Sequence, residues 1–204
     1  MSIDFNSLTP EQATVMLLRG WDDGTIKNSD NLQHLLDLGA DINVTDENGV
    51  NPLMKAANKT DDVKCLQLLL QAGIPITARD NSGRTALIAA LAGNKVENVR
   101  LLVDAGANVN IKLSENNLST PLMLACLNCD TEIIKILVDA SASINATDKF
   151  GYTALMIAIE LNKIDVIELL LENGAKVDAD IKQFAGHFPE FIKTNTYKKI
   201  LNMY

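Results

Sequence analysis

The stretch DKFGYTALMIAIELNKIDVIELLLENGAKVD, from Asp148 to Asp178, decides the fold. It opens with a turn at Asp148–Gly151, and its apolar spacing predicts a helix from Thr153 to about Leu161. A second helix is predicted from Ile164 to Glu172, and Gly174 marks its end. The stretch is therefore one turn–helix–turn–helix block of about 33 residues.

The same block recurs along the chain. The helix-ending signal appears as LLDLGADIN, LLQAGIPIT, LVDAGANVN, LVDASASIN and LLENGAKVD, with anchor residues Gly39, Gly73, Gly106, Ser141 and Gly174. The anchors lie 34, 33, 35 and 33 residues apart. A helix-opening signal recurs in phase as NPLMKAA, TALIAAL, TPLMLAC and TALMIAI, starting at Asn51, Thr85, Thr120 and Thr153. Two signals in phase at this period indicate a repeat protein.

Each recurring position has a physical role. The polar residue that opens each first helix can cap its N-terminus. Pro52 and Pro121 follow such a cap at the first helical position, where a missing N–H costs nothing. The glycine after the second helix supplies a left-handed C-cap. Ser141 replaces this glycine in one repeat, which we expect to cost up to about 1 kcal/mol locally.

With these motifs the chain resembles the ankyrin repeat family over about residues 30–180. The family pattern is D-x-x-G-x, then T-P-L-H-x-A-A, a second helix ending L-L-x-x-G-A, and D-V-N. The histidine of that pattern is absent here, and its place is taken by Met54, Ile88, Met123 and Met156. The resemblance implies an all-α solenoid of helix–turn–helix repeats with β-hairpin-like fingers, comprising five repeats and a C-terminal helical cap.

The two ends of the chain depart from the repeat. Residues 1–45 are expected to form a divergent capping repeat, with a helix capped by Thr9 that runs to about Gly20 and is followed by Trp21. Four ankyrin repeats are expected over residues 46–180. Residues 181–204 should form the C-terminal cap, ending in one helix from about Glu190 to Asn202.

Composition limits the function. The 204 residues are 47% hydrophobic and 22% charged, which suits a globular or repeat protein. The net charge of -8 repels phosphate backbones, so we expect no nucleic-acid partner. The apolar runs are too short to cross a bilayer, so no membrane role is expected. Three cysteines do not make a disulfide framework, which favours a reducing, cytoplasmic location.

Cys126-Leu127-Asn128-Cys129 is the one motif that suggests chemistry. As a zinc knuckle it would need two further ligands, and the repeat phase scatters the other candidates. As a redox pair it lies at the wrong end of a predicted helix to gain an acidic thiol. Core packing is the preferred interpretation. The sequence therefore predicts no catalytic, cofactor or metal site, and no enzyme.

The remaining candidate site is the surface that the resemblance implies, which consists of the hairpin tips and the concave face of the first helices. Phe150 and Tyr152 are candidate anchors, because aromatic residues and arginine are favoured at binding hot spots. The expected contact residues are Glu47, Asn48, Val50, Asn58, Asn81, Ser82, Arg84, Asn116, Asn117, Lys149, Phe150, Tyr152 and Glu160. The longer finger at residues 112–118 is either a partner contact or a tolerated insertion.

We therefore predict a non-enzymatic, monomeric module that binds a partner protein. One alternative is a bacterial effector, secreted into a host cell and acting on host proteins; it rests on a composition rich in Asn, Lys and Ile. A metal or redox protein using Cys126 and Cys129 is a second alternative, and self-association through a terminal repeat is a third.

Overall fold

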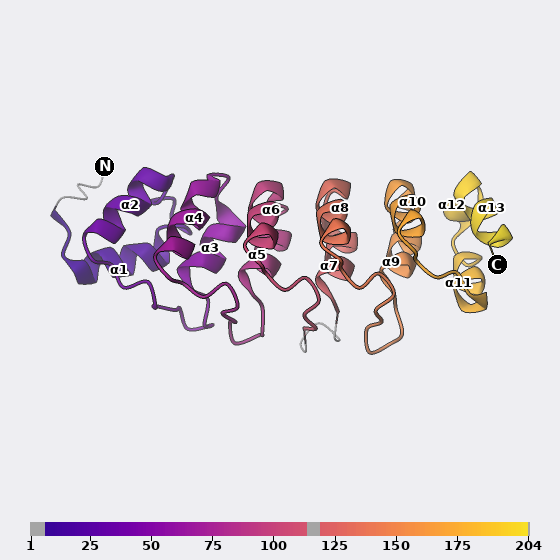
Figure 1. Ribbon diagram of the computed structural model, residues 1–204, viewed down its shortest axis with the longest axis horizontal. Coiled ribbons are helices and arrows are strands. Elements are labelled where there is room, and N and C mark those ends of the chain that lie inside the picture. The colour runs from indigo at the N-terminus through magenta and orange to yellow at the C-terminus, as the bar shows by residue number, and fades with distance from the viewer. Residues whose placement is uncertain (1–6, 114–118, 204) are drawn as a thin grey trace. The chain divides into compact units, whose positions relative to one another are not determined.

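The computed structural model describes residues 7–113 and 119–203. Within these ranges the chain forms thirteen helices and no strand. The chain divides into two compact units between Asn108 and Val109, and each unit is described by itself. The fold is the all-α ankyrin-repeat arrangement that the sequence predicts, with helix pairs separated by projecting fingers (Figure 1).

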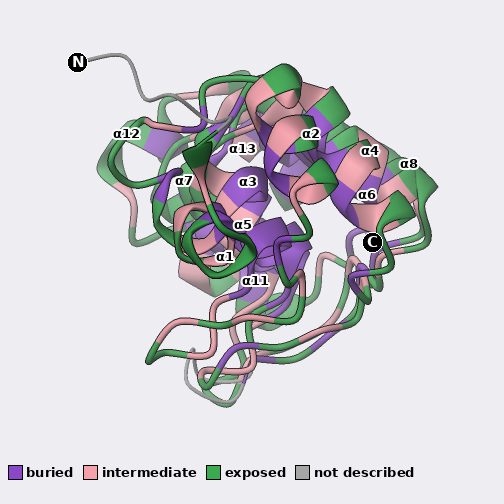
Figure 2. Cartoon of the chain, turned by 90° about the vertical axis from the view of Figure 1, so that its left-hand side faces the viewer, coloured by how far each residue is buried: buried purple, intermediate pink, exposed green. Residues whose placement is uncertain are grey.

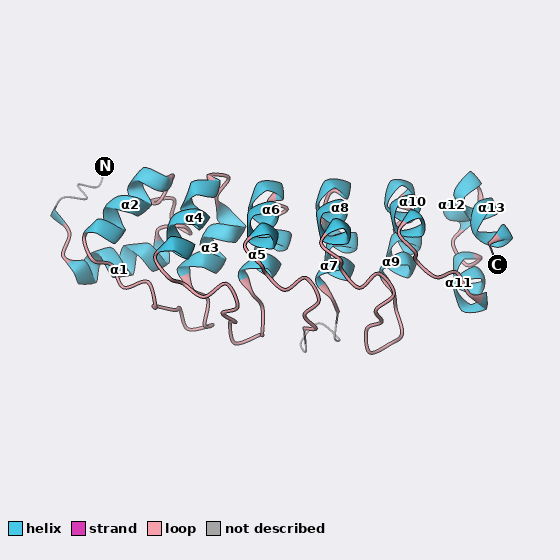
Figure 3. Cartoon of the chain, in the orientation of Figure 1, coloured by secondary structure: helices cyan, strands magenta, loops and turns pink. Residues whose placement is uncertain are grey.

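The first unit contains three helix pairs. Its helices are α1 (Pro10–Arg19), α2 (Ser29–Asp37), α3 (Pro52–Lys59), α4 (Val63–Gln71), α5 (Ala86–Ala92) and α6 (Val96–Asp104). In Figure 3 the fingers that follow α2 and α4 leave the helices on the same side of this unit. The first pair has a long connection, in which Trp21 is buried directly after α1.

The second unit contains two regular helix pairs and three further helices. The pairs are α7 (Pro121–Asn128) with α8 (Thr131–Asp139), and α9 (Ala154–Glu160) with α10 (Ile164–Glu172). The further helices are α11 (Ala179–Ala185), α12 (Pro189–Ile192) and α13 (Asn195–Asn202).

The prediction of one C-terminal helix over Glu190–Asn202 is wrong. Thr194 takes an extended conformation and accepts a hydrogen bond from the Tyr197 N–H, so it starts a new helix, α13. The Thr194 hydroxyl also donates to the Phe191 carbonyl at the end of α12, which closes the shorter helix. The side chain of one threonine therefore divides the predicted helix in two.

Most of the predicted caps are present. Asn51, Thr120 and Thr153 each accept a hydrogen bond from the backbone N–H three residues later. Thr85 occupies the same N-cap position in extended conformation, but its side chain does not bond the helix. The caps and the two proline residues explain why the first helices begin where the sequence predicts.

The core is aliphatic and lies between the helices of each unit. Figure 2 shows buried residues on helices such as α3 and α5, and exposed residues along the fingers. At the positions of the family histidine, Met54, Ile88 and Met123 are buried, while Met156 is partly exposed. Methionine and isoleucine side chains therefore occupy the positions at which the family pattern has histidine.

Ser141 adopts the left-handed conformation that the repeat demands, with φ at 63°. The glycines at the equivalent positions, such as Gly106 and Gly174, have φ near 90°. A side chain in this region strains the backbone, which glycine avoids.

We expect Ser141→Gly to stabilise the second unit by about 1 kcal/mol, because it removes this strain. The measurement is the urea midpoint followed by circular dichroism. Ser143→Gly is the control, because Ser143 is exposed two residues away and does not have a positive φ. There the extra freedom of the unfolded chain should make the change neutral or destabilising. A gain in both variants would contradict the strain argument.

Candidate functional site

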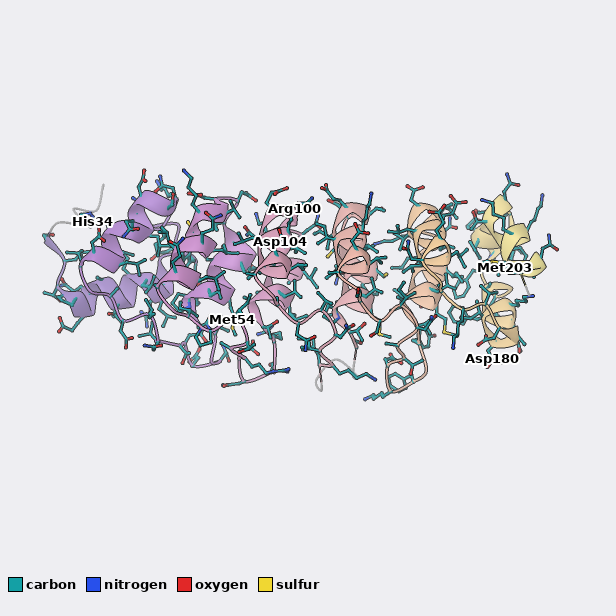
Figure 4. All side chains as sticks on the ribbon, viewed as in Figure 1. His34, Met54, Arg100, Asp104, Asp180 and Met203 are labelled. Carbon is teal, nitrogen blue, oxygen red and sulfur yellow. The ribbon has the colours of Figure 1, made fainter. Side chains whose placement is uncertain are left out.

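The first unit contains a pocket of about 260 Å³ between α3 and α5, and residues of the first two fingers also line it. We call it the α3–α5 pocket. Its lining residues are Asp22, Asp46, Val50, Met54, Lys55, Asn58, Lys59, Asp80, Arg84, Thr85, Ile88, Ala89 and Ala92. Met54 lies on the finger side of α3 (Figure 4). Small-molecule sites usually measure about 300–1,000 Å³, so this pocket has room for one or two side chains.

Lys55 is fixed at one wall of the pocket. Its Nζ lies 2.6 Å from Asp22 and 3.2 Å from Asp46, and its side chain is 13% exposed. Burial disfavours the ammonium, but the hydrogen bonds to Asp22 and Asp46 outweigh this effect and hold the pKa of Lys55 above its ordinary value. Lys59, half-exposed on the next turn of α3, lies 3.8 Å from the second Asp22 oxygen. This wall is therefore charged but internally neutralised.

Arg84, at the end of the second finger, also lines the pocket. Its Nε donates to Asp80 at 2.7 Å, and the Asp80 side chain is only 2% exposed. Half of the Arg84 side chain stays exposed. A buried carboxylate thus holds the guanidinium in one orientation while part of it faces solvent. On the same side, Asn58 donates its side-chain N–H to the Ala89 carbonyl, which ties α3 to α5.

The fingers are built around an aspartate that accepts two backbone hydrogen bonds. Asp46 accepts from the N–H groups of Asn48 and Val50, and Asp80 accepts from those of Ser82 and Arg84. Burial works against the Asp46 carboxylate, but the Val50 N–H, Lys55 and the Asn48 N–H keep the pKa of Asp46 below its ordinary value. The first two fingers are also joined, because Asn81 donates from its backbone to the Asn48 carbonyl.

The structure places the predicted contact residues of the first unit in two groups. Val50, Asn58 and Arg84 line the α3–α5 pocket. The finger-tip residues lie outside it, with Ser82 partly buried and the others exposed: Glu47, Asn48, Asn81 and Ser82. Asn116 and Asn117 lie outside the described residues.

In the second unit, Phe150 and Tyr152 differ in environment although they flank the same turn. The Phe150 side chain is 67% exposed, and the Lys149 Nζ lies 4.9 Å from its ring centroid. The Tyr152 ring packs edge-on against Phe184 of α11, with centroids 5.6 Å apart. Glu160, at the end of α9, is exposed. Tyr152 therefore packs the finger against α11, whereas the Phe150 side chain remains exposed to solvent.

We expect Phe150→Ala to change the free energy of unfolding by less than about 0.5 kcal/mol, because the ring is mostly exposed. Tyr152→Ala should cost about 1 kcal/mol, because it removes the contact with Phe184. Denaturation midpoints of both variants check this difference. If the two changes cost the same, Tyr152 does not have the packing role assigned to it.

The two cysteines of the CxxC motif are buried. Cys126 lies within α7, and Cys129 is the residue that ends it. Burial raises the pKa of Cys126 to about 12 and that of Cys129 to about 11. Thiols of this kind are mostly protonated at neutral pH, which lowers their reactivity, because the thiolate is the nucleophile. None of the three cysteines forms a disulfide.

Residues 7–113 and 119–203 contain no cluster of three His, Cys, Asp or Glu side chains that could hold a metal ion. Across the same ranges, no helix combines the length and the apolar character needed to span a membrane.

Of the charged residues that shape the pocket, Arg84 is among the predicted contact residues, whereas Asp22, Asp46, Lys55 and Asp80 are not. Asp46 and Asp80 begin the D-x-x-G turns, and this motif was the available signal for their role. Asp22 lies in the irregular connection after α1, and Lys55 is an unremarkable helix residue in the sequence. Nothing in the sequence predicts that the two meet.

Comparison with known proteins agrees with the repeat fold. The family model described as ankyrin repeats (3 copies) matches residues 25–113 and 111–181. These matches cover more than half of the chain. The chain belongs to the ankyrin repeat family.

Similar proteins include repeat proteins of larger size. Ankyrin repeat and SOCS box protein 6 of Pongo abelii is 39% identical over 87 residues, which are 39% of this chain and 21% of that protein. The human protein of the same name is 38% identical over 87 residues, with the same shares. E3 ubiquitin-protein ligase KEG of Arabidopsis thaliana is 35% identical over 102 residues, 48% of this chain and 6% of that protein. The matched regions span about a fifth or less of these relatives.

Proposed function

We propose that this chain is a non-enzymatic module that holds a segment of a partner protein in the α3–α5 pocket, with additional contacts from the finger tips. The observation that carries the proposal is the combination of an apolar floor with charged walls that the protein already holds in place. Lys55 is fixed by two carboxylates and Arg84 by the buried Asp80. A partner binding here does not have to order these long side chains, which lowers the entropic cost of association.

The comparisons support protein recognition and not catalysis. Ankyrin repeats are protein-interaction modules, and the ankyrin repeat model matches more than half of this chain. The relative named as a ligase matches over only 6% of its length, so its activity gives no support to an enzymatic role here. The protonated, buried thiols of Cys126 and Cys129 support the same conclusion for the redox alternative.

We further propose that the module acts as a monomer and does not bind nucleic acid. The net charge of -8 repels phosphates at long range. A cytoplasmic location suits three buried cysteines without a disulfide, because a reducing compartment keeps thiols in that form.

The test uses two exposed positions at matched places in the fold. Ala92 and Gln71 are the last residues of α5 and α4, and only Ala92 lines the pocket. Ala92→Arg should fill the pocket and reduce partner capture from a lysate at least about tenfold, whereas Gln71→Arg adds the same charge elsewhere and should not. Quantitative mass spectrometry of captured proteins reads the difference. Equal capture by both variants would exclude this pocket as the binding site.

A further inference from the structure

The floor of the α3–α5 pocket is apolar. Met54 and Ile88 are 3% and 4% exposed, and both line the pocket. Ala89 and Ala92 continue the same surface along α5. Where the family pattern has a histidine, which can donate and accept hydrogen bonds, this chain presents a thioether and a methyl group. A polar side chain placed against this floor would lose hydrogen bonds to water without replacement, and an aliphatic side chain would not.

The rim of the pocket consists of its charged lining residues: Asp22, Asp46, Lys55, Lys59, Asp80 and Arg84. Each of its three carboxylates already has donors or a cation as partner. Asp80 accepts from the backbone N–H groups of Ser82 and Arg84 and from the Arg84 Nε. Asp46 likewise accepts two backbone N–H groups and lies 3.2 Å from the Lys55 Nζ. Asp22 is half-exposed, and its two oxygens lie 2.6 Å from the Lys55 Nζ and 3.8 Å from the Lys59 Nζ. Each of the three carboxylates is therefore paired with a cation of the same pocket.

The cations of the rim are less completely engaged. A guanidinium carries five N–H donors in a fork that matches a carboxylate. The Arg84 side chain is half-exposed, with its Nε on Asp80. The Lys59 side chain is also half-exposed, and its partner oxygen lies at 3.8 Å. An incoming carboxylate can use the open part of these cations without displacing a bond that holds the pocket together.

We infer that the partner segment presents an aliphatic side chain to the floor formed by Met54 and Ile88, and an adjacent aspartate or glutamate to Arg84 and Lys59. This inference rests on the function proposed above and adds the chemistry of the partner. The aliphatic group is buried against Met54, whose unbranched side chain adapts to different shapes. The carboxylate accepts from the guanidinium that Asp80 holds in place.

The net charge of the chain opposes this partner at long range. At a physiological ionic strength of about 0.15 M, however, charges are screened beyond about 8 Å, so the exposed cations nearest the partner act on it at contact more than the net charge of the chain does. Slow association at low salt, becoming faster as salt is added, is the expected signature of a local attraction within a repulsive overall field.

The experiment selects short random peptides displayed on phage against the full chain. The recovered peptides are then measured by fluorescence polarisation. Peptides that compete for the pocket should combine an aliphatic residue with Asp or Glu close in sequence. Changing that acidic residue to its amide, or the aliphatic residue to serine, should each weaken binding at least about tenfold.

Arg84→Ala should weaken binding to a similar extent and should clearly reduce the effect of the amide change in the peptide, since the carboxylate and the guanidinium form a pair and only Lys59 then remains opposite the carboxylate. Arg79→Ala is the matched control. Arg79 lies on the same finger and bonds the Gly83 carbonyl, but it does not line the pocket. Its loss should leave affinity within about twofold.

The outcomes separate this inference from the function on which it rests. Peptides that Ala92→Arg blocks but that are rich in Lys or Arg would overturn the inference alone. The inference would also be overturned if the losses of affinity caused by Arg84→Ala and by the amide change in the peptide were additive, because no carboxylate would then face Arg84. The proposed function would be overturned too if the recovered peptides bound the Ala92→Arg variant and the original chain with equal affinity. A selection that yields no peptide dependent on the pocket would have the same consequence.

Discussion

Asn98→Asp is expected to destabilise the first unit by about 3 kcal/mol or more. Asn98 lies on α6, is 1% exposed, and donates its side-chain N–H groups to the carbonyls of Ala57 and Thr60 at 3.1 and 2.8 Å. An aspartate of the same shape cannot donate when ionised, so its charge would face two carbonyl oxygens in a buried site. Those carbonyls mark the end of α3, so the change also weakens the connection between two helix pairs.

The measurement is the thermal midpoint by circular dichroism, which should fall by about 6–12 °C for a chain of this size. The deficit should be larger at about pH 8 than at about pH 5, because burial raises the pKa of the new carboxyl and the protonated acid is uncharged. Asn145→Asp is the matched control. Asn145 is exposed, donates to the Gly174 carbonyl and accepts from the Lys176 N–H, so an aspartate keeps one of its two bonds. It should cost less than about 1 kcal/mol, and equal losses would disprove the role of burial.

Gly93→Ala should destabilise the first unit by about 2–3 kcal/mol. Gly93 ends α5 with an ordinary φ of -84°, so its backbone conformation does not require glycine. The lack of space requires glycine here, because a Cβ at this position would overlap the Asn58 carbonyl oxygen of α3. Backbone cannot move aside as a flexible side chain can, so α5 must shift from α3. The same shift opens the α3–α5 pocket, because both helices line it.

Urea denaturation measures the loss. Gly186→Ala is the matched control, since Gly186 also ends a helix, α11, with φ at -66°. Its nearest backbone contact to a new Cβ is the Gln183 oxygen at 3.3 Å, a distance that a small adjustment relieves. A change within about 1 kcal/mol is expected there. If Gly93→Ala proves no worse than Gly186→Ala, the close approach of α5 to α3 does not limit the residue at this position.

The repeat period made the helix pairs predictable. Ile164–Glu172 was predicted with both ends as observed, because its limits coincide with signals that recur elsewhere in phase. The C-terminal helices were not predictable in the same way, because they lie outside the repeat register. In that segment the capping by Thr194 determines where one helix ends and the next begins, and the apolar pattern of the sequence does not reveal this.

Some residues that line the α3–α5 pocket could be named from the sequence, but the charge pairs between them could not. Arg84 and Asn58 were identified from their place in the repeat. The contact between Tyr152 and Phe184 was missed, because Phe184 comes from a segment without repeat register. Asn98 was missed because a polar residue on a helix normally faces solvent, and only the position of the Ala57 and Thr60 carbonyls shows why this one does not.

The aspartate at the base of each described hairpin finger has a consequence for how such a protein can diversify. Asp46, Asp80 and Asp148 hold their turns through backbone N–H groups, whatever side chains those N–H groups belong to. Exposed tip side chains such as Glu47, Asn48 and Phe150 therefore contribute little to folding. The residues at each finger tip can therefore be substituted while the aspartate hydrogen bonds that hold the turn are retained. Grafting a new tip between the aspartate and the turn glycine should change what the module recognises without a new scaffold.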